Sequence, residues 1–306
     1  MMSIEIILLK QILIMFLLML IGFLLFKGKK ITLQGNKEFG TFLIYVILPA
    51  SIIKSYITEL TFGKLVGLLI SFISALLALA LSIGIAHLVF GNRQKIENFG
   101  TSFSNAGFIG IPLVKAVVGE HAIFYIAAFV ALLNILQWTY GVVIMSGNKE
   151  AVSIKKLLSN PIVIALLIGI LLFLTQMPIP ALITDTLGLI GNMTAPVAMI
   201  TLGVYMAQMR LWEIFTEKWV YVCAALRLVV IPMITLIFLC LVPNIYRDIK
   251  LTVLVAASAP AGSNVAFFAQ LNGLDYRRAV KGICMTTLFS IITMPIILLV
   301  AQKIWI

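Results

Sequence analysis

Long apolar runs constrain this chain more than any other feature of its sequence. About 20 apolar residues are needed for a helix to cross the hydrocarbon core of a bilayer, and the 306-residue chain contains ten runs that approach this length. Hydrophobic residues make up 62% of the chain and charged residues only 11%, whereas a soluble domain has about 25% charged residues. We therefore predict an all-α, multi-pass membrane protein with ten transmembrane helices, at residues 6–26, 39–58, 65–90, 98–118, 122–145, 160–176, 181–208, 219–241, 250–271 and 281–304.

The basic residues lie mostly between the apolar runs, and their number alternates from one side to the other. Loops after odd-numbered spans contain 14 Lys and Arg residues, and the opposite side contains seven. Cytoplasmic loops carry an excess of Lys and Arg. The count predicts a multi-pass protein of the plasma (cytoplasmic) membrane, which is the inner membrane in a bacterial cell, with both termini outside. The net charge of +11 is not gathered on one soluble face, so we expect the lipid bilayer, and no nucleic acid, as a partner.

The fourth span is interrupted by polar and helix-breaking residues. Its sequence at 101–114, TSFSNAGFIGIPLV, includes Ser104, Asn105, Gly107, Gly110 and Pro112. Proline cannot donate a backbone hydrogen bond, and glycine adds backbone freedom. Irregular backbone within a membrane is tolerated only where protein or a water-filled cavity surrounds it. We predict a helix broken near mid-membrane, with a polar site at the break; the alternative is a kinked helix that packs through its small residues.

The ninth span contains a second stretch of the same kind. Its sequence at 258–270, SAPAGSNVAFFAQ, combines Pro260 and Gly262 with the adjacent pair Ser263 and Asn264. Interrupted helices in matching positions of two halves are the best sequence indication of a mid-membrane binding site. The second stretch therefore favours a binding site over simple packing.

The spacing of the prolines indicates an internal repeat. Pro49 and Pro112 are 63 residues apart in the first half, and Pro196 and Pro260 are 64 residues apart in the second. Because five spans are an odd number, the second half enters the membrane the opposite way up, which is the inverted repeat of many secondary transporters. We predict a first repeat over residues 1–145, a cytoplasmic loop over 146–159 and a second repeat over 160–306.

The two five-span halves and the sequences FSNAGFIGIPLV and ASAPAGSNVAFFAQ resemble the auxin efflux carrier family, and the resemblance covers the whole chain. This family includes bacterial malate and malonate permeases and the plant PIN proteins. The resemblance implies a scaffold domain and a transport domain, each built from parts of both repeats, with spans 4 and 9 crossing in the transport domain. It also implies an elevator-type carrier of small organic anions, such as mono- or dicarboxylates or auxin-like acids, that forms a homodimer.

Asn105 and Asn264 are the leading candidates for binding the substrate. Each amide offers two donors and an acceptor, and helix N-termini that restart after each break would add partial positive charge for an anion. Hydrogen bonding between helices is the alternative role. The predicted substrate-binding residues lie in the two breaks and on spans 2, 5 and 7: Ser51, Ser104, Asn105, Gly107, Gly110, Pro112, Gln137, Asn192, Thr194, Pro260, Gly262, Ser263 and Asn264.

Two charged residues are candidates for coupling. Arg227 is the one basic residue deep within a span, and a charge near mid-bilayer costs at least roughly 2.5 kcal/mol. It could attract the substrate, or it could pair with Asp185 or with backbone carbonyls. Asp185 near the outer end of the seventh span could bind a proton or sodium; the alternative is a solvated helix end.

No catalytic motif, metal-ligand set or cofactor signature occurs in the sequence. We therefore expect no enzymatic activity, no metal and no cofactor, and proton or sodium coupling stays open. Three functions compete with the organic-anion carrier. They are a sodium-coupled symporter of larger organic anions that resembles the bile-acid carriers, a membrane sensor that binds a ligand without transporting it, and a channel.

Overall fold

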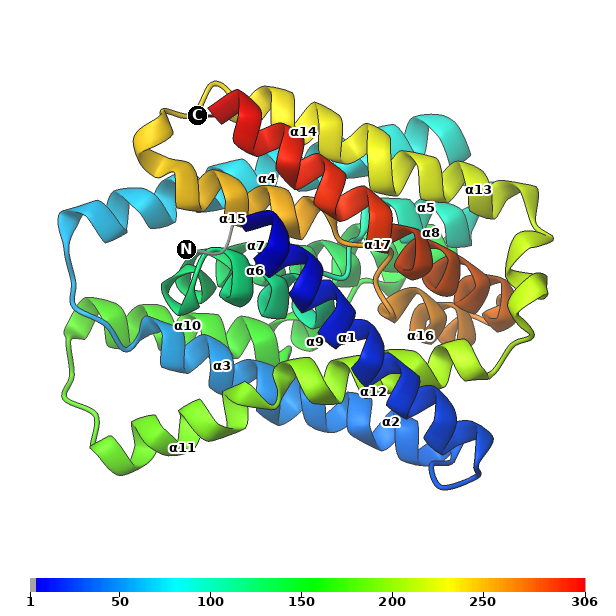
Figure 1. Ribbon diagram of the computed structural model, residues 1–306, viewed down its shortest axis with the longest axis horizontal. Helices are drawn as coiled ribbons and strands as arrows, with labels where there is room; N and C mark the ends of the chain where they lie inside the picture. The colour runs from blue at the N-terminus through cyan, green and yellow to red at the C-terminus, as the bar shows by residue number, and fades with distance from the viewer. Residues whose placement is uncertain (1–3, 306) are drawn as a thin grey trace.

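The computed structural model describes residues 4–305, and helices form nearly all of its regular structure (Figure 1). Seven helical runs among these residues are long and apolar enough to cross a membrane. They are α1 (Ile4–Lys27), α2 (Leu33–Phe42) continuing into α3 (Leu48–Tyr56), α4 (Phe62–Phe90), α7 (Ile123–Leu136) continuing into α8 (Val142–Ser146), α11 (Ala181–Asn192) continuing into α12 (Thr194–Ala207), α13 (Lys218–Ala225) continuing into α14 (Ile231–Leu239), and α17 (Tyr276–Trp305).

The other predicted spans are built from shorter helices. The sixth is α10 (Pro161–Thr175), and α9 (Ile154–Leu158) lies in the loop before it. The fourth consists of α5 (Lys95–Ser102) and of the helical run Ala106–Val117, which ends in α6 (Ile111–Val117). The ninth consists of α15 (Arg247–Ser258) and α16 (Asn264–Leu271). The all-α, multi-pass architecture is confirmed, while the number of ten crossing helices stays a prediction.

Several helices continue through a proline by widening into a π-helical turn just before it. The proline ring clashes with the carbonyl four residues earlier and leaves it without its usual donor. A π-turn accommodates such an interruption without ending the helix. The pairs of turn and proline are Leu43–Ile47 with Pro49, Ala106–Gly110 with Pro112, and Leu226–Val230 with Pro232.

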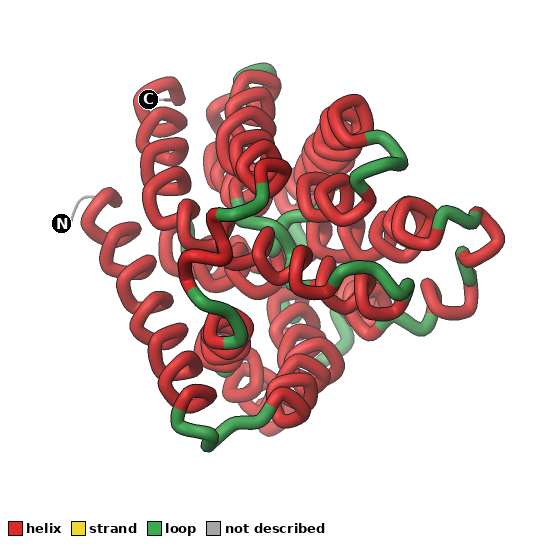
Figure 2. Tube along the Cα trace, turned by 90° about the vertical axis from the view of Figure 1, so that its right-hand side faces the viewer, coloured by secondary structure: helices red, strands yellow, loops and turns green. Residues whose placement is uncertain are grey.

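The helices form two groups. In the first, α1 packs along α12, and α3 packs against α10 and α11. In the second, α4 packs against α5, α7 and α15, while α17 packs against α13, α15 and α16. Figure 1 places most of the first group in the lower part of the view and most of the second in the upper part. Figure 2 shows helices running in several directions, with loops mostly at their ends.

The loops lie at two opposite ends of the molecule. In Figure 1 the connection from α3 to α4 and that from α10 to α11 lie at the left edge, and the connection from α12 to α13 lies at the right edge. The connections after the second and sixth predicted spans thus lie at one end, and the connection after the seventh lies at the other. The left end would be the outer side in the orientation that the charge count predicts.

Two glycines allow α1 and α12 to make contact through their backbones. A Cβ atom on Gly22 would lie 2.1 Å from the carbonyl oxygen of Ile200, and one on Gly203 would lie 1.9 Å from that of Met19. Small residues at a helix contact allow this approach in membranes, where close packing replaces the hydrophobic driving force. The first group of helices is therefore held together by a crossing that only glycine permits.

We expect Gly203→Val to destabilise the protein. The added side chain must push α1 away from α12, and overpacking of this kind costs about 1–3 kcal/mol. The measurement is the apparent melting temperature of the purified protein in detergent. Gly84→Val on α4 is the matched control, because a Cβ at Gly84 would meet nothing within 4 Å. Equal melting temperatures for the two variants would contradict this interpretation of the contact.

Candidate functional site

The two interrupted stretches meet and pair through their backbones. Helix α5 ends at Ser102, and helical backbone restarts at Ala106. Residues 103–105 run antiparallel to residues 260–262, with a single bridge between Ser104 and Ala261. The amide of Gly262 donates to the carbonyl of Phe103 at 2.9 Å. In return, the amide of Asn105 donates to the carbonyl of Pro260 at 2.7 Å.

This pairing satisfies backbone groups that the helix ends leave open. A helix end has up to four backbone groups without a partner in the helix, and a lipid-facing one would have no water to bind. Gly262 lets the chains approach, since a Cβ there would lie 3.2 Å from the carbonyl oxygen of Ser104. The amide of Ala261 is held separately by the hydroxyl of Thr286 on α17, at 3.1 Å.

A small cavity of about 30 Å³ lies where the stretches cross, and we call it the crossing cavity. Apolar residues of α3, α7 and α10 complete its walls. The structure brings seven of the predicted binding residues to it: Ser104, Asn105, Gly107, Gln137, Gly262, Ser263 and Asn264.

The polar groups of the crossing cavity are only partly satisfied by the protein. Asn264 donates its side-chain amide to Gln137 Oε1 at 2.8 Å. Asn105 Oδ1 accepts from the amide of Phe108 at 3.4 Å and so caps the restarting helix. Asn105 Nδ2 and Ser104 Oγ have no partner among the described residues, although Asn105 is only 4% exposed and Ser104 2%. Leaving such a group unpaired costs about 1–3 kcal/mol, so these two atoms favour a polar ligand.

A second cavity of about 340 Å³, which we call the outer cavity, lies between the two groups of helices. It contains four more predicted residues, Ser51, Pro112, Asn192 and Thr194. Both cavities are lined by α3: Leu48 lines the crossing cavity, and Ser51, one turn further along the helix, lines the outer one. The outer cavity is the larger, but Ser104 and Asn105, with their unsatisfied polar atoms, line the smaller one.

The charged residues of the outer cavity were not predicted from the sequence as part of a site. Lys54, Lys115, Glu120 and His121 all contribute to its lining. Lys115 Nζ lies 2.8 Å from Asn192 Oδ1 and 3.5 Å from a carboxylate oxygen of Glu120. In the sequence the two lysines contribute only to the charge count. Their common signal is that each follows a proline of a predicted span by three to five residues, on the side of the membrane that the charge count predicts to be outside.

Two predicted binding residues line neither cavity. Gly110 lies against Ile126, where a Cβ would come within 3.3 Å of its side chain, and so permits helix packing. Pro260 contributes its carbonyl to the backbone pairing.

Arg227 lies at the crossing without lining either cavity. It is only 1% exposed, and its Nη1 donates to the carbonyl of Thr101 at 2.9 Å, while Nη2 donates to the carbonyl of Ala257. Its partners are therefore backbone carbonyls, which was one of the two predicted structural roles, and not Asp185. Asp185 is exposed on α11 and contacts neither cavity.

Comparison with known proteins identifies the family. The family model described as "Membrane transport protein" matches residues 7–298. The chain belongs to this family. The resemblance to the auxin efflux carriers is thereby confirmed, and the protein is a membrane transporter.

Two relatives cover most of the chain. A protein named "Putative malonate transporter" from Rhizobium meliloti (strain 1021) is 24% identical over 273 residues, which cover 83% of each chain. A protein named "Uncharacterized transporter MJ1031" from Methanocaldococcus jannaschii is 23% identical over 300 residues, which cover 93% of this chain and 96% of the relative. Family and relatives indicate a transporter rather than an enzyme.

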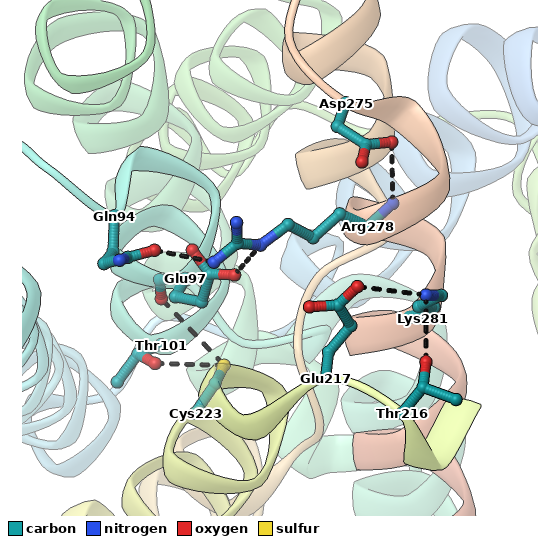
Figure 3. A network of polar contacts seen from close by, with 9 residues as sticks. All are labelled: Gln94, Glu97, Thr101, Thr216, Glu217, Cys223, Asp275, Arg278 and Lys281. Carbon is teal, nitrogen blue, oxygen red and sulfur yellow. Dashed lines mark hydrogen bonds and ion pairs between the residues drawn. The ribbon is translucent and has the colours of Figure 1, made fainter. Parts of the chain in front are cut away.

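A polar network anchors the first half of the interrupted fourth span of this transporter (Figure 3). The carboxylate of Glu97 on α5 is paired with Arg278 on α17, and Arg278 also donates to Gln94 Oε1 at 2.6 Å. The hydroxyl of Thr101 donates to Cys223 Sγ on α13 at 3.1 Å. Helix α5 is thus fixed to two neighbours before its backbone breaks.

We expect Glu97→Gln to destabilise the transporter by about 3 kcal/mol. The Glu97 side chain is 3% exposed, and removing one partner of a buried ion pair leaves the other charge uncompensated. Thermal unfolding in detergent measures the loss. Glu120→Gln is the matched control, because its pair with Lys115 has side chains 65% and 37% exposed and such pairs contribute about 0–1 kcal/mol. The interpretation fails if both variants lose the same stability.

Proposed function

We propose that this membrane transporter is a secondary carrier of small organic anions and that it binds its substrate in the crossing cavity. The observation that carries the proposal is the arrangement of unsatisfied donors there. The amide of Asn105 and the hydroxyl of Ser104 are buried and unpartnered among the described residues. Asn264, whose amide donates to Gln137, lines the same cavity from the other stretch. Amide donors suit a carboxylate, and they hold it without a charge that would be expensive in the membrane.

The helix ends favour an anion for a second reason. The run Ala106–Val117 begins at the crossing cavity, where Gly107 and Phe108 line it. Helix α16 begins there as well, at Asn264. Each helix N-terminus carries a partial positive charge of roughly half an elementary charge. Two N-termini directed at one small cavity attract negative charge, and discontinuous membrane helices present their N-termini to anionic substrates in other carriers.

The outer cavity supplies the route to this site. Its volume of about 340 Å³ accommodates a small organic acid, whereas about 30 Å³ at the crossing accommodates about one or two waters. We infer that the substrate first enters between Lys54 and Lys115, and that the crossing cavity widens to receive it. Long-range attraction by the two lysines would raise the local concentration of anions.

The two groups of helices suit an elevator motion. The group with α1, α2–α3, α10 and α11–α12 would form the scaffold, and the group that contains both interrupted stretches would move against it. Among the described contacts, polar links between the groups are few: Lys115 contacts Asn192, Tyr276 donates to Gln208 at 2.9 Å, and Asn160 donates to Asn134 at 3.4 Å. Hydrogen bonds of this kind can be exchanged during a rigid-body movement. In this account the chain has ten spans in two inverted repeats and works as a homodimer in the plasma membrane.

Malonate is the first substrate to test. The relative from Rhizobium meliloti is named "Putative malonate transporter". A small dicarboxylate has two carboxylate groups, which suit a cavity with two helix N-termini and two side-chain amides. Malate and indole acetate extend the test to a larger dicarboxylate and to an auxin-like monocarboxylate. Saturable uptake into proteoliposomes supports a carrier, whereas binding without uptake would support a sensor and contradict the proposal.

We expect Asn105→Ala and Asn264→Ala each to lower uptake at least about tenfold, because each removes hydrogen bonds to a charged ligand. The measurement is the initial rate of labelled malonate uptake into proteoliposomes. Asn272→Ala is the matched control: Asn272 follows α16, and its amide donates to the carbonyl of Phe268 at 2.8 Å, outside the crossing cavity. Wild-type rates in both test variants would refute the proposed site.

Lys54→Gln should raise the KM for uptake severalfold and leave kcat nearly unchanged, because the lysine attracts the anion before it reaches the crossing cavity. The difference should shrink as the salt concentration rises, since exposed charges are screened. Lys64→Gln is the control: Lys64 is predicted to lie on the same side of the membrane, where it binds Thr58 at 2.6 Å, and it lines neither cavity. A fall in kcat at constant KM would contradict the assigned role.

A further inference from the structure

Four helix ends meet at the crossing, and the partial charges of these ends differ in sign. The N-termini of the run Ala106–Val117 and of α16 face the crossing cavity, as described above. The C-termini of α5 and α15 lie just before the paired segments in the chain, at Ser102 and Ser258. A helix C-terminus carries about half a negative elementary charge, from carbonyls that have no partner within the helix. Left alone, these two ends would oppose the binding of an anion nearby.

Arg227 contacts both negative ends with one side chain. Its two terminal nitrogens donate to the carbonyls of Thr101 in α5 and of Ala257 in α15. Each of these carbonyls belongs to the second-last residue of its helix. The planar guanidinium is suited to bridging two acceptors, and it stays protonated even when buried. It therefore joins the two interrupted spans at equivalent positions.

No carboxylate neutralises Arg227 within the described part of the chain. The ion pairs found there involve Lys115, His121, Arg278 and Lys281. Two helix C-termini supply together roughly one negative elementary charge, which balances the single charge of the guanidinium. This balance explains how a side chain that is 1% exposed can hold a charge in the membrane without an acidic partner.

Helix α13 and its π-turn hold Arg227 in place. Cys223 and Arg227 are four residues apart, and both contact Thr101: Cys223 through the threonine hydroxyl and Arg227 through the carbonyl. Arg227 lies in the π-turn Leu226–Val230, just before Pro232. The cation therefore belongs to a helix that packs against the broken helix α5, and would move with the crossing.

We propose that Arg227 is the built-in cation of the crossing, which neutralises the C-termini of α5 and α15 so that only the positive ends act on the substrate. In other carriers the ends of half-helices and unwound carbonyls bind a sodium ion or a proton. Here a guanidinium binds carbonyls at two such helix ends. Transport consequently requires no metal cation at this point. The inference rests on the proposed function of the crossing cavity as the substrate site.

Chemical rescue tests this role. Arg227→Ala should lower malonate uptake about tenfold or more, since it removes hydrogen bonds from a charged group. Guanidinium at about 10 mM, far below denaturing concentrations, should restore a substantial part of the rate. Urea at the same concentration is the matched neutral control and should restore none. Wild-type uptake should be the same in sodium and in choline medium.

Lys250→Met is the matched control variant. Lys250 is a second buried cation, but it binds Asn244 Oδ1 at 2.8 Å and lies over the ring of Trp305 at 4.5 Å, away from the two breaks. Guanidinium should not raise the uptake of this variant. A normal rate for Arg227→Ala, equal rescue by urea and guanidinium, or a strict requirement of the wild type for sodium would each overturn the inference.

A second readout separates this inference from the proposed function. The melting temperature of purified Arg227→Ala should rise with guanidinium and not with urea, whether or not the protein transports malonate. If Arg227→Ala does not fold, Arg227→Lys and Arg227→Met replace it, and the lysine variant should be the more stable because it keeps the charge. Absence of wild-type uptake with every anion tested would refute the proposed function alone. Equal melting temperatures for the lysine and methionine variants would refute the role of Arg227.

Discussion

The structure depends on one constraint: every backbone amide and carbonyl within the membrane needs a hydrogen-bond partner. Two helices are interrupted at the same depth, and neither break could stand alone in lipid. Backbone groups of each break bind those of the other: the amide of Asn105 donates to the carbonyl of Pro260, and the amide of Gly262 donates to that of Phe103. Arg227 binds one further carbonyl at the end of each helix, that of Thr101 in α5 and that of Ala257 in α15. Polar side chains are thereby held in the interior of a protein that is 62% hydrophobic.

The same arrangement separates the negative helix C-termini from the positive helix N-termini. Helix C-termini face a buried guanidinium, and helix N-termini face the crossing cavity with the amides of Asn105 and Asn264. In the proposed function, an anion at this site would be attracted by fixed dipoles and neutral donors and would meet no full charge. Such a site binds without holding the ligand irreversibly, which a carrier needs because it must release its substrate on the other side. Around it, Glu97 and Arg278 fix α5 to α17, as the proposed joint movement of the groups that form the site would require.

The sequence was sufficient to predict the helical, multi-pass architecture and the family, and it identified seven residues that gather at one cavity. Those predictions rest on local signals: apolar length, and proline, glycine and asparagine within apolar runs. The pairing of Phe103 with Gly262 and the contact between Gly22 and Ile200 could not be predicted, because they join segments far apart in the chain. Lys54 and Lys115 went unrecognised because a lysine near a span end is ordinary, and only the packing of α3, α6 and α11 turns the pair into a cavity lining.

Protection of an introduced cysteine tests most directly whether the substrate occupies the crossing cavity. Ser263→Cys places a thiol in that cavity, and Ser159→Cys places one in the exposed loop after α9. The measurement is the rate at which a small thiol reagent modifies each variant in proteoliposomes, with and without saturating malonate. The account predicts that malonate slows modification of Ser263→Cys and leaves Ser159→Cys unchanged. Malonate that is transported but does not slow the reaction of Ser263→Cys would contradict it.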